Sequence, residues 1–294
     1  MIPLRTAVVG QDHIHLPDHL AGLERAGATR CADPARADAI ICGASTAERE
    51  RMLPGLTRFG VPVLAEKPLA ATAPATAALL RSAAAPVTTA MFLRCCPALA
   101  ALRGLLATGR LGEPRSAELA YRHDGWLRGA FTGGAAWMAD PARLPGGALA
   151  DLGIHLVDLL AWLGPAPRGP RAVRVRRDRP GGAVLAGRAE LGWGAATATL
   201  RTDWACRSGG LTVRITAARG VAEVRDGSLT LDQGRGPEPL LHGPGPAAAD
   251  AVVAFLRQLR GGPRVLPEPG EIQAVAELMD QLLDAAGVTA RPTG

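Results

Sequence analysis

Strand-like and helix-like segments alternate through the first third of the chain, and this alternation limits the fold more than any other feature. Short apolar runs predict buried strands, at 5–10, 37–42, 61–65 and 87–92. Apolar residues at helical spacing predict the intervening helices, from residue 16 and at 46–59, 72–84 and 97–108. Strands that are separated by helices form parallel sheets. We therefore expect an α/β first domain over residues 1–112.

The pattern changes in residues 113–294, where strands follow one another without helices between them. Alternating or apolar runs predict strands at 116–123, 172–177, 183–193, 195–204, 211–217, 221–224 and 228–231. One strongly apolar helix is expected at 149–163, and two further helices at 247–259 and 271–286. This order predicts an α+β second domain with a largely antiparallel open sheet. Whether the last helices pack back on the first domain is left open.

Composition excludes several classes of protein. Hydrophobic residues make up 48% of the 294 residues and charged residues 20%, so the chain can bury a core and is not disordered. No apolar run reaches the length of a membrane span, and the first residues lack the pattern of a signal peptide. The 5 cysteines include no C-x-x-C pair, which argues against a disulfide framework. We expect a soluble, cytoplasmic protein.

The chain is basic, with a formal net charge of +6, which raises the question of a nucleic-acid partner. The arginines are mostly scattered singly, and aromatic residues are only 3% of the chain, so few rings are available to stack on bases. We expect a small-molecule substrate rather than a nucleic acid.

One cation stands apart, because Lys67 is the single lysine among 33 basic residues. An ammonium in a buried position can exchange a proton, whereas a guanidinium holds its proton at any ordinary pH. Lys67 follows a predicted strand, at the edge where open α/β sheets bind ligands. It is therefore a candidate acid or base. The alternative is that a composition rich in Ala, Gly, Pro and Arg simply leaves few lysines.

A second group of polar residues lies within the apolar helix at 149–163. Asp151, His155 and Asp158 are spaced four and three residues apart, so they share one face of that helix. A carboxylate one turn from an imidazole can orient the ring for general acid or base catalysis. The alternative is an ordinary solvated face.

These residues, in this order, resemble the Gfo/Idh/MocA family of nicotinamide-dependent oxidoreductases. The motifs that carry the resemblance are E-K-P at 66–68, F-L-R at 92–94 followed by Pro97, G-R-L-G at 109–112, and Trp137 ahead of a G-G-x-x-x-D-x-G-x-H-x-x-D run at 146–158. The resemblance covers nearly the whole chain.

The resemblance implies hydride transfer between NAD or NADP and a hydroxyl, carbonyl or imine of a small polar metabolite. It implies that Lys67, His155 and Asp151 are catalytic. The residues that it implies for cofactor binding are Gly10, Asp12, His13, Glu66, Lys67 and Pro68, and those for substrate binding are Arg94, Trp137, Asp158 and His15. Relatives of this kind also imply a homodimer or homotetramer that forms through the exposed face of the second domain's sheet.

The chain departs from the family at the nucleotide-binding turn. Gly10 is kept, but Asp12 and His15 stand where the second and third glycines of a G-x-G-x-x-G fingerprint are expected. The spacing to Lys67 is short, so we expect a truncated Rossmann-like domain that lacks most of the family's second and third strands. Asp33 is then not expected to be the ribose-binding acid. The alternative function is a cofactor-free descendant, either a non-redox acid/base enzyme for elimination, isomerisation or cyclisation, or a non-catalytic partner subunit.

Histidines crowd the same turn, at positions 13, 15 and 19. Such residues can bind a transition metal, but the sequence places no carboxylate or cysteine clearly enough to complete a ligand set. We therefore expect no metal. The alternative role for His13 and His15 is to line a cleft for non-redox acid/base chemistry.

Overall fold

The structure is a computed structural model that describes residues 3–10 and 13–288. The chain divides into two compact units. Unit 1 contains the chain up to Cys95 together with Pro246–Glu277, and unit 2 contains Cys96–Gly245 together with the chain from Leu278. Sequence analysis expects the boundary after residue 112 instead. The difference arises because the helix at Pro97–Ala107 packs within unit 2, and the chain returns to unit 1 after the strands of unit 2 are complete.

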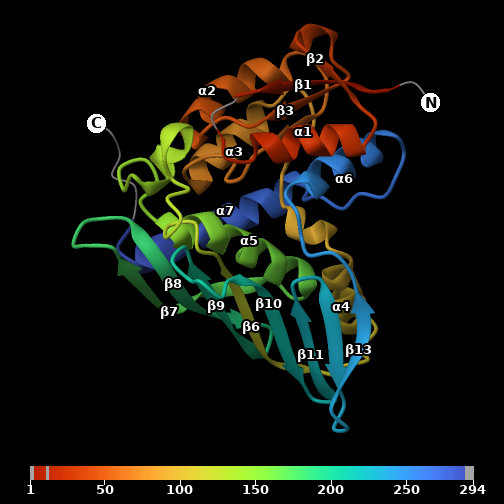
Figure 1. The fold of residues 1–294 in the computed structure, drawn as a ribbon, viewed down its shortest axis with the longest axis vertical. Coiled ribbons are helices and arrows are strands. Elements are labelled where there is room, and N and C mark those ends of the chain that lie inside the picture. The colour runs from red at the N-terminus through yellow and green to blue at the C-terminus, as the bar shows by residue number, and fades with distance from the viewer. Residues whose placement is uncertain (1–2, 11–12, 289–294) are drawn as a thin grey trace. The chain divides into compact units, whose positions relative to one another are not determined.

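Unit 1 is built on a parallel sheet of five strands in the order β2-β1-β3-β4-β5 (Figure 1). The strands are β1 (Arg5–Val9), β2 (Thr29–Cys31), β3 (Ala39–Cys42), β4 (Val63–Ala65) and β5 (Val87–Thr89). Every residue of β3 and β4 is buried, as expected for central strands of a parallel sheet covered on both faces. The predicted α/β fold class is confirmed.

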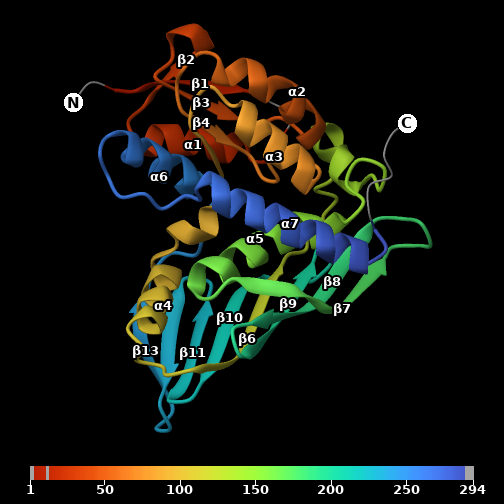
Figure 2. The same ribbon diagram turned by 180° about the vertical axis from the view of Figure 1, so that it is seen from behind.

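Helices cover both faces of this sheet. Helix α1 is on the face toward the viewer in Figure 1, and α3 is on the face toward the viewer in Figure 2. The helical elements of unit 1 are α1 (Leu16–Arg25), η1 (Pro34–Arg36), α2 (Thr46–Thr57), α3 (Ala73–Ser82), η2 (Phe92–Cys95) and α6 (Ala249–Leu259). Gly22 allows α1 to approach α6, because a Cβ at that position would lie 2.6 Å from the Cβ of Val252. Helix α7 (Pro269–Ala285) begins in unit 1 and ends in unit 2.

Strand β2 corrects one expectation. The sequence leads us to expect that the second strand is largely absent, but Thr29–Cys31 pairs in parallel with β1 at the outer edge of the sheet. The strand is only 3 residues long and partly exposed, so it carries no apolar run. The described chain has no strand between β2 and β3, where the short η1 turn stands instead. The truncation is therefore real, but it removes one strand rather than two.

Unit 2 contains a sheet of eight strands in the order β13-β12-β11-β10-β6-β9-β8-β7. Neighbouring strands are antiparallel except β6 and β9, which are parallel, so the sheet is mixed and mostly antiparallel. The strands are β6 (Pro114–Arg122), β7 (Pro167–Arg177), β8 (Val184–Trp193), β9 (Ala196–Asp203), β10 (Gly210–Ala217), β11 (Gly220–Arg225), β12 (Ser228–Asp232) and β13 (Pro237–His242). Sequence analysis does not predict β13, which contains two prolines and is mostly exposed.

One face of this sheet packs on α5 (Gly147–Leu163), with α4 (Pro97–Ala107) alongside (Figure 2). The remaining helical element of unit 2 is η3 (Gly133–Ala139). At Gly147 a Cβ would lie 2.3 Å from the carbonyl oxygen of Val184, so only glycine allows α5 to start this close to β8. No helix in the described part of the chain is long and apolar enough to cross a bilayer.

Candidate functional site

The carboxyl edge of the unit 1 sheet carries the predicted E-K-P residues. Glu66 and Lys67 follow β4 directly and are only 3% and 5% exposed, and Pro68 is half-buried. The Lys67–Pro68 peptide bond is cis. A buried lysine at the carboxyl end of a parallel strand lies where open α/β folds place their ligands.

A buried arginine that sequence analysis does not single out holds this loop in place. Arg49 lies on α2 and is 0% exposed. Its guanidinium donates to the carbonyl oxygens of Ala44, Pro68 and Leu69, so it ties the turn after β3 to the loop that carries Lys67. No local pattern distinguishes Arg49 from the other arginines on the predicted helices, because its partners are distant in sequence.

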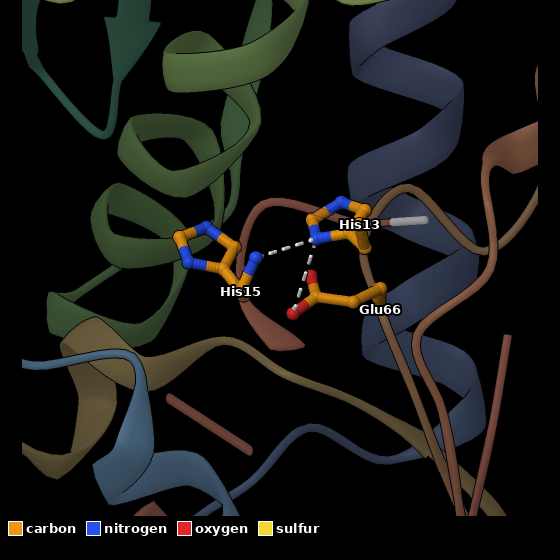
Figure 3. A group of neighbouring side chains, drawn as sticks. All are labelled: His13, His15 and Glu66. Carbon is orange, nitrogen blue, oxygen red and sulfur yellow. Dashed lines mark hydrogen bonds and ion pairs between the residues drawn. The ribbon is translucent and has the colours of Figure 1, made fainter. Parts of the chain in front are cut away.

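Three histidines and Glu66 form one polar cluster beside this loop (Figure 3 shows His13, His15 and Glu66). His19 Nε2 lies 2.9 Å from Glu66 Oε1, and His13 Nδ1 lies 4.0 Å from the same oxygen. The backbone N–H of His15 donates to His13 Nδ1 at 3.3 Å. His13, His19 and Glu66 are all buried, whereas His15 is half-buried. Glu66 is therefore the carboxylate that sequence analysis could not place near the histidines.

Burial sets the protonation states in this cluster. It lowers the pKa of His13 to about 4, so its ring is neutral at pH 7. Burial alone would raise the pKa of the Glu66 carboxyl, but the neighbouring histidines outweigh this effect and lower it well below its ordinary value. The cluster thus combines an imidazole lone pair with an ionised carboxylate.

The pKa of His13 predicts acid sensitivity. An unfolded chain protonates this ring near pH 6.5, and the folded protein does so only near pH 4. Between these values the unfolded state binds more protons, so the free energy of unfolding should fall by about 3 kcal/mol as the pH drops from about 6.5 to 4. The stabilisation that Glu66 provides should be lost only below the carboxyl's ordinary pKa of 4.5. Urea titrations over this pH range, with a chelator present, measure the fall.

The matched comparison is His13→Asn, which should unfold with a clearly weaker pH dependence between pH 6.5 and 4 than the wild type. His242→Asn is the control, since His242 is exposed on β13 and its loss should leave the dependence unchanged. An unchanged dependence in the His13 variant would show that this histidine is not the group responsible.

Unit 2 holds the second predicted group, on α5. Asp151, His155 and Asp158 are 7%, 2% and 1% exposed, so they are not the solvated face of a surface helix. The indole Nε1–H of Trp204 donates to Asp151 Oδ2 at 3.1 Å. The ring of Tyr121, the single tyrosine of the chain, lies edge-on to His155 with centroids 6.1 Å apart. Neither aromatic partner could be identified from the sequence, because Tyr121 on β6 and Trp204, just after β9, are distant from α5 along the chain.

Two predicted substrate-binding residues have structural partners. Arg94 is 3% exposed and donates to Glu271 Oε1 at 2.9 Å within unit 1. Trp137 is 7% exposed and packs in a core cluster of unit 2 that includes Phe131 and Trp204. Their predicted contact with substrate stays a prediction, as do the roles of Asp158 and His15.

A nicotinamide dinucleotide, which the resemblance implies, can be tested against the edge of the unit 1 sheet. Gly10 follows β1 with φ +70°, and a Cβ there would lie 2.5 Å from the Cβ of Ala44, so this position requires glycine, as the first position of a dinucleotide-binding turn does. Asp33 follows the end of β2 and is exposed. An acid at the end of the second strand is the group that binds an adenosine ribose. Gly10 and Asp33 are thus placed where the cofactor would need them, and whether Asp33 binds a ribose stays a prediction.

The phosphate-binding part of the turn differs from a glycine-rich one. Asp12, at the second glycine position, lies outside the described residues. The backbone N–H groups of His15 and Leu16 both donate to His13, and Pro17 has no N–H. Among the described residues 13–17, these three positions therefore offer no backbone N–H to a pyrophosphate, so we expect the cofactor to bind more weakly here than at a G-x-G-x-x-G turn.

Comparison with known proteins identifies the second part of the chain. Residues 99–223 match the profile of the GFO/IDH/MocA C-terminal domain. This part of the chain is therefore similar to a GFO/IDH/MocA C-terminal domain. The match contains β6, β8, β9 and the α5 residues Asp151, His155 and Asp158, so the resemblance drawn from the motifs is confirmed there. A search of curated proteins finds no match.

Solved structures show the same fold over nearly the whole chain. An oxidoreductase from Agrobacterium radiobacter in complex with NAD+, L-tartaric acid and magnesium superposes with a TM-score of 0.81 at 15% identity, over 97% of each chain. An inositol dehydrogenase homologue from Azotobacter vinelandii with NAD+ gives 0.82 at 16% identity, over 97% of this chain and 95% of the other. The 3-ketoreductase KijD10 from Actinomadura kijaniata, with NADP and TDP-benzene, gives 0.76 at 18% identity, over 97% and 98%. At these identities the likeness establishes the fold.

Proposed function

We propose that the protein is an NAD(P)-dependent oxidoreductase that acts on a hydroxyl, carbonyl or imine of a small polar metabolite. The observation that carries the proposal is the buried Lys67 at the carboxyl end of β4. The GFO/IDH/MocA C-terminal domain supports it, because that domain supplies a buried histidine and two aspartates on α5. Solved proteins of the same fold bind NAD+ or NADP.

The proposed roles follow from the chemistry of each side chain. A bound nicotinamide would accept or donate the hydride. Lys67, His155 and Asp151 are proposed to hold or move the substrate's hydroxyl proton, as general acids or bases. Trp204 orients Asp151 through its indole N–H, so we assign it a positioning role. Arg94, Asp158, Trp137 and His15 remain the proposed substrate-binding residues.

The proposal is tested by a substrate survey. Purified protein is incubated with NAD or NADP and a panel of polyols, sugars and hydroxy acids, and formation of the reduced nicotinamide is followed by absorbance. We expect turnover with at least one compound of this class. Mass spectrometry of small molecules retained by the protein narrows the panel beforehand.

A cofactor-free acid/base enzyme, or a non-catalytic subunit, is the second candidate. One observation favours it, because His13 already occupies the backbone donors of His15 and Leu16 at the phosphate-binding turn. In that case Lys67 and His155 would catalyse elimination, isomerisation or cyclisation without hydride transfer. Activity that needs no nicotinamide would support this candidate.

Asp33 leads to a prediction about cofactor choice. Its exposed carboxylate at the end of β2 can accept a bond from a ribose 2′-OH and repel a 2′-phosphate, so we expect NAD to bind more tightly than NADP. Asp33→Asn should weaken this preference: the dissociation constant of NADP divided by that of NAD should fall by about tenfold, or 1.4 kcal/mol. Calorimetric titrations of both proteins with NAD and NADP measure the ratio.

Asp38→Asn is the matched control, because Asp38 is also on unit 1 but pairs with Arg5. It should leave the preference unchanged. Equal preferences in the wild type and the Asp33 variant would remove Asp33 from the ribose site.

The proposal also covers the oligomeric state and the cellular compartment of the protein. We propose a homodimer or homotetramer that forms through the exposed face of the unit 2 sheet, which sedimentation tests by the mass of the particle. A cytoplasmic location belongs to the same proposal, since 5 cysteines without a C-x-x-C pair suit a reducing compartment.

A further inference from the structure

The cluster at the start of α1 has the composition of a metal-binding site. His13, His15 and Glu66 each offer one ligand atom, and these atoms all lie within 4.8 Å of one another. Figure 3 shows the His13 ring facing the Glu66 carboxylate, with the His15 ring beside them. Two imidazoles and one carboxylate are a set that divalent transition metals use in proteins.

The hydrogen bonds of His13 and His15 indicate which ring nitrogen of each is unprotonated and can bind a cation. The backbone N–H of His15 donates to His13 Nδ1, so this nitrogen is the unprotonated one and lies on the side of Glu66. A cation would replace that 3.3 Å contact. His15 Nδ1 lies 3.0 Å from Asp18 Oδ2, and a proton shared there leaves Nε2 as the lone-pair nitrogen of that ring.

Each of the other two candidate ligands is also held by an outer partner. Asp18 bonds His15, as carboxylates do behind metal-bound histidines, and His19 Nε2–H donates to the Glu66 carboxylate at Oε1 over 2.9 Å. The backbone N–H of Lys67 donates to Glu66 Oε2 at 3.2 Å. These bonds fix the orientation of His15 and Glu66 from outside the proposed ligand set. Such support is typical of a built metal site.

We propose that His13, His15 and Glu66 bind a divalent first-row transition metal, with Zn²⁺ as the reference ion. Tetrahedral zinc has ligand atoms about 3.3 Å apart, given bonds near 2.0 Å, so ligand atoms that lie up to 4.8 Å apart must close by up to about 1.5 Å on binding. His15 is half-buried at the N-terminal end of α1, whereas His13 and Glu66 are buried, so we assign most of this movement to His15. Three protein ligands leave the fourth position to water or another oxygen donor.

The nature of the ligands excludes Mg²⁺ and Ca²⁺ as preferred ions. Both take oxygen ligands almost entirely, whereas two of the three groups here are imidazoles. The inference concerns unit 1 alone. It uses His13, His15 and Glu66, which are also proposed for cofactor and substrate binding, so metal affinity is measured without nucleotide and nucleotide affinity without metal; the failure of either proposal is then distinguishable from that of the other.

The test uses the untagged full-length protein after dialysis against a chelator. Zn²⁺ is titrated by calorimetry, and Co²⁺ by the visible absorption that a four-coordinate site produces. We expect one ion per chain and at least about a tenfold weaker affinity in His15→Ala, His13→Gln and Glu66→Gln, because even an outer partner contributes 10–100-fold. Asp18→Asn should weaken binding while all three ligands remain.

His242→Ala is the matched control, because it removes an exposed histidine of unit 2 and should leave the affinity unchanged. Circular dichroism identifies any variant that fails to fold. If Glu66→Gln does not fold, the test rests on His15→Ala, because a substitution at this half-buried position is expected to leave the fold intact. No binding at millimolar Zn²⁺, or an equal affinity in the wild type and the His15 variant, would overturn the proposal.

Discussion

Replacing Lys67 by alanine is expected to reduce turnover by about 10²–10⁴-fold, the usual contribution of a general acid or base. Lys67 is the single lysine of the chain, is 5% exposed, and lies at the carboxyl end of β4. Arg49 holds the loop that carries it through the carbonyl oxygens of Pro68 and Leu69, and these bonds do not involve the Lys67 side chain. The variant should therefore remain folded. Steady-state kinetics with the substrate found in the survey, together with thermal unfolding, measure both effects.

Lys67→Arg separates proton transfer from charge. Arginine keeps the positive charge but does not exchange its proton, so we expect it to be nearly as inactive as alanine. Recovery of activity in the arginine variant would show that Lys67 only supplies charge. Unchanged turnover in the alanine variant would remove it from the reaction.

A loss of similar size, about 10²–10⁴-fold in turnover, is expected for His155→Asn. His155 is 2% exposed on α5, one turn after Asp151, and asparagine keeps a polar side chain of smaller volume at this buried position. Because the ring would act on the substrate's proton, the pH dependence of turnover should also change. Measurement of kcat and kcat/KM across pH records both effects.

His242→Asn again serves as the control, since this exposed histidine should be replaceable without loss of turnover. A His155 variant that retains full turnover with an unchanged pH profile would contradict the assignment. A variant that loses turnover only in proportion to folded protein would show a structural role.

Periodicity in the sequence predicts the elements that are buried and regular. The fully buried β3 and the apolar α5 both appear close to their expected bounds, because burial on all sides leaves a clear apolar run. Strands β2 and β13 are missed for the opposite reason. Each lies at the edge of its sheet, where few positions need to be apolar and even prolines are tolerated.

Contacts between distant parts of the chain explain what the sequence could not predict about the candidate site. The spacing of Asp151 and His155 implies a shared helix face, and burial on α5 follows from the apolar residues around them. In contrast, Glu66 meets His19 from 47 positions away, and Trp204 meets Asp151 from 53 positions away. Such pairs depend on strand order, which no local pattern specifies. The same applies to Pro246–Glu277, which returns to unit 1 after the whole sheet of unit 2.

Binding of a nicotinamide nucleotide is the central claim, and calorimetric titration of the purified protein with NAD, NADH, NADP and NADPH tests it most directly. We expect saturable binding with a dissociation constant in the micromolar range and a preference for NAD(H), because Gly10 keeps the tight turn and Asp33 follows β2. No binding of any of the four at millimolar concentration would contradict the account. It would leave Lys67, His155 and Asp151 to chemistry without hydride transfer, or to none.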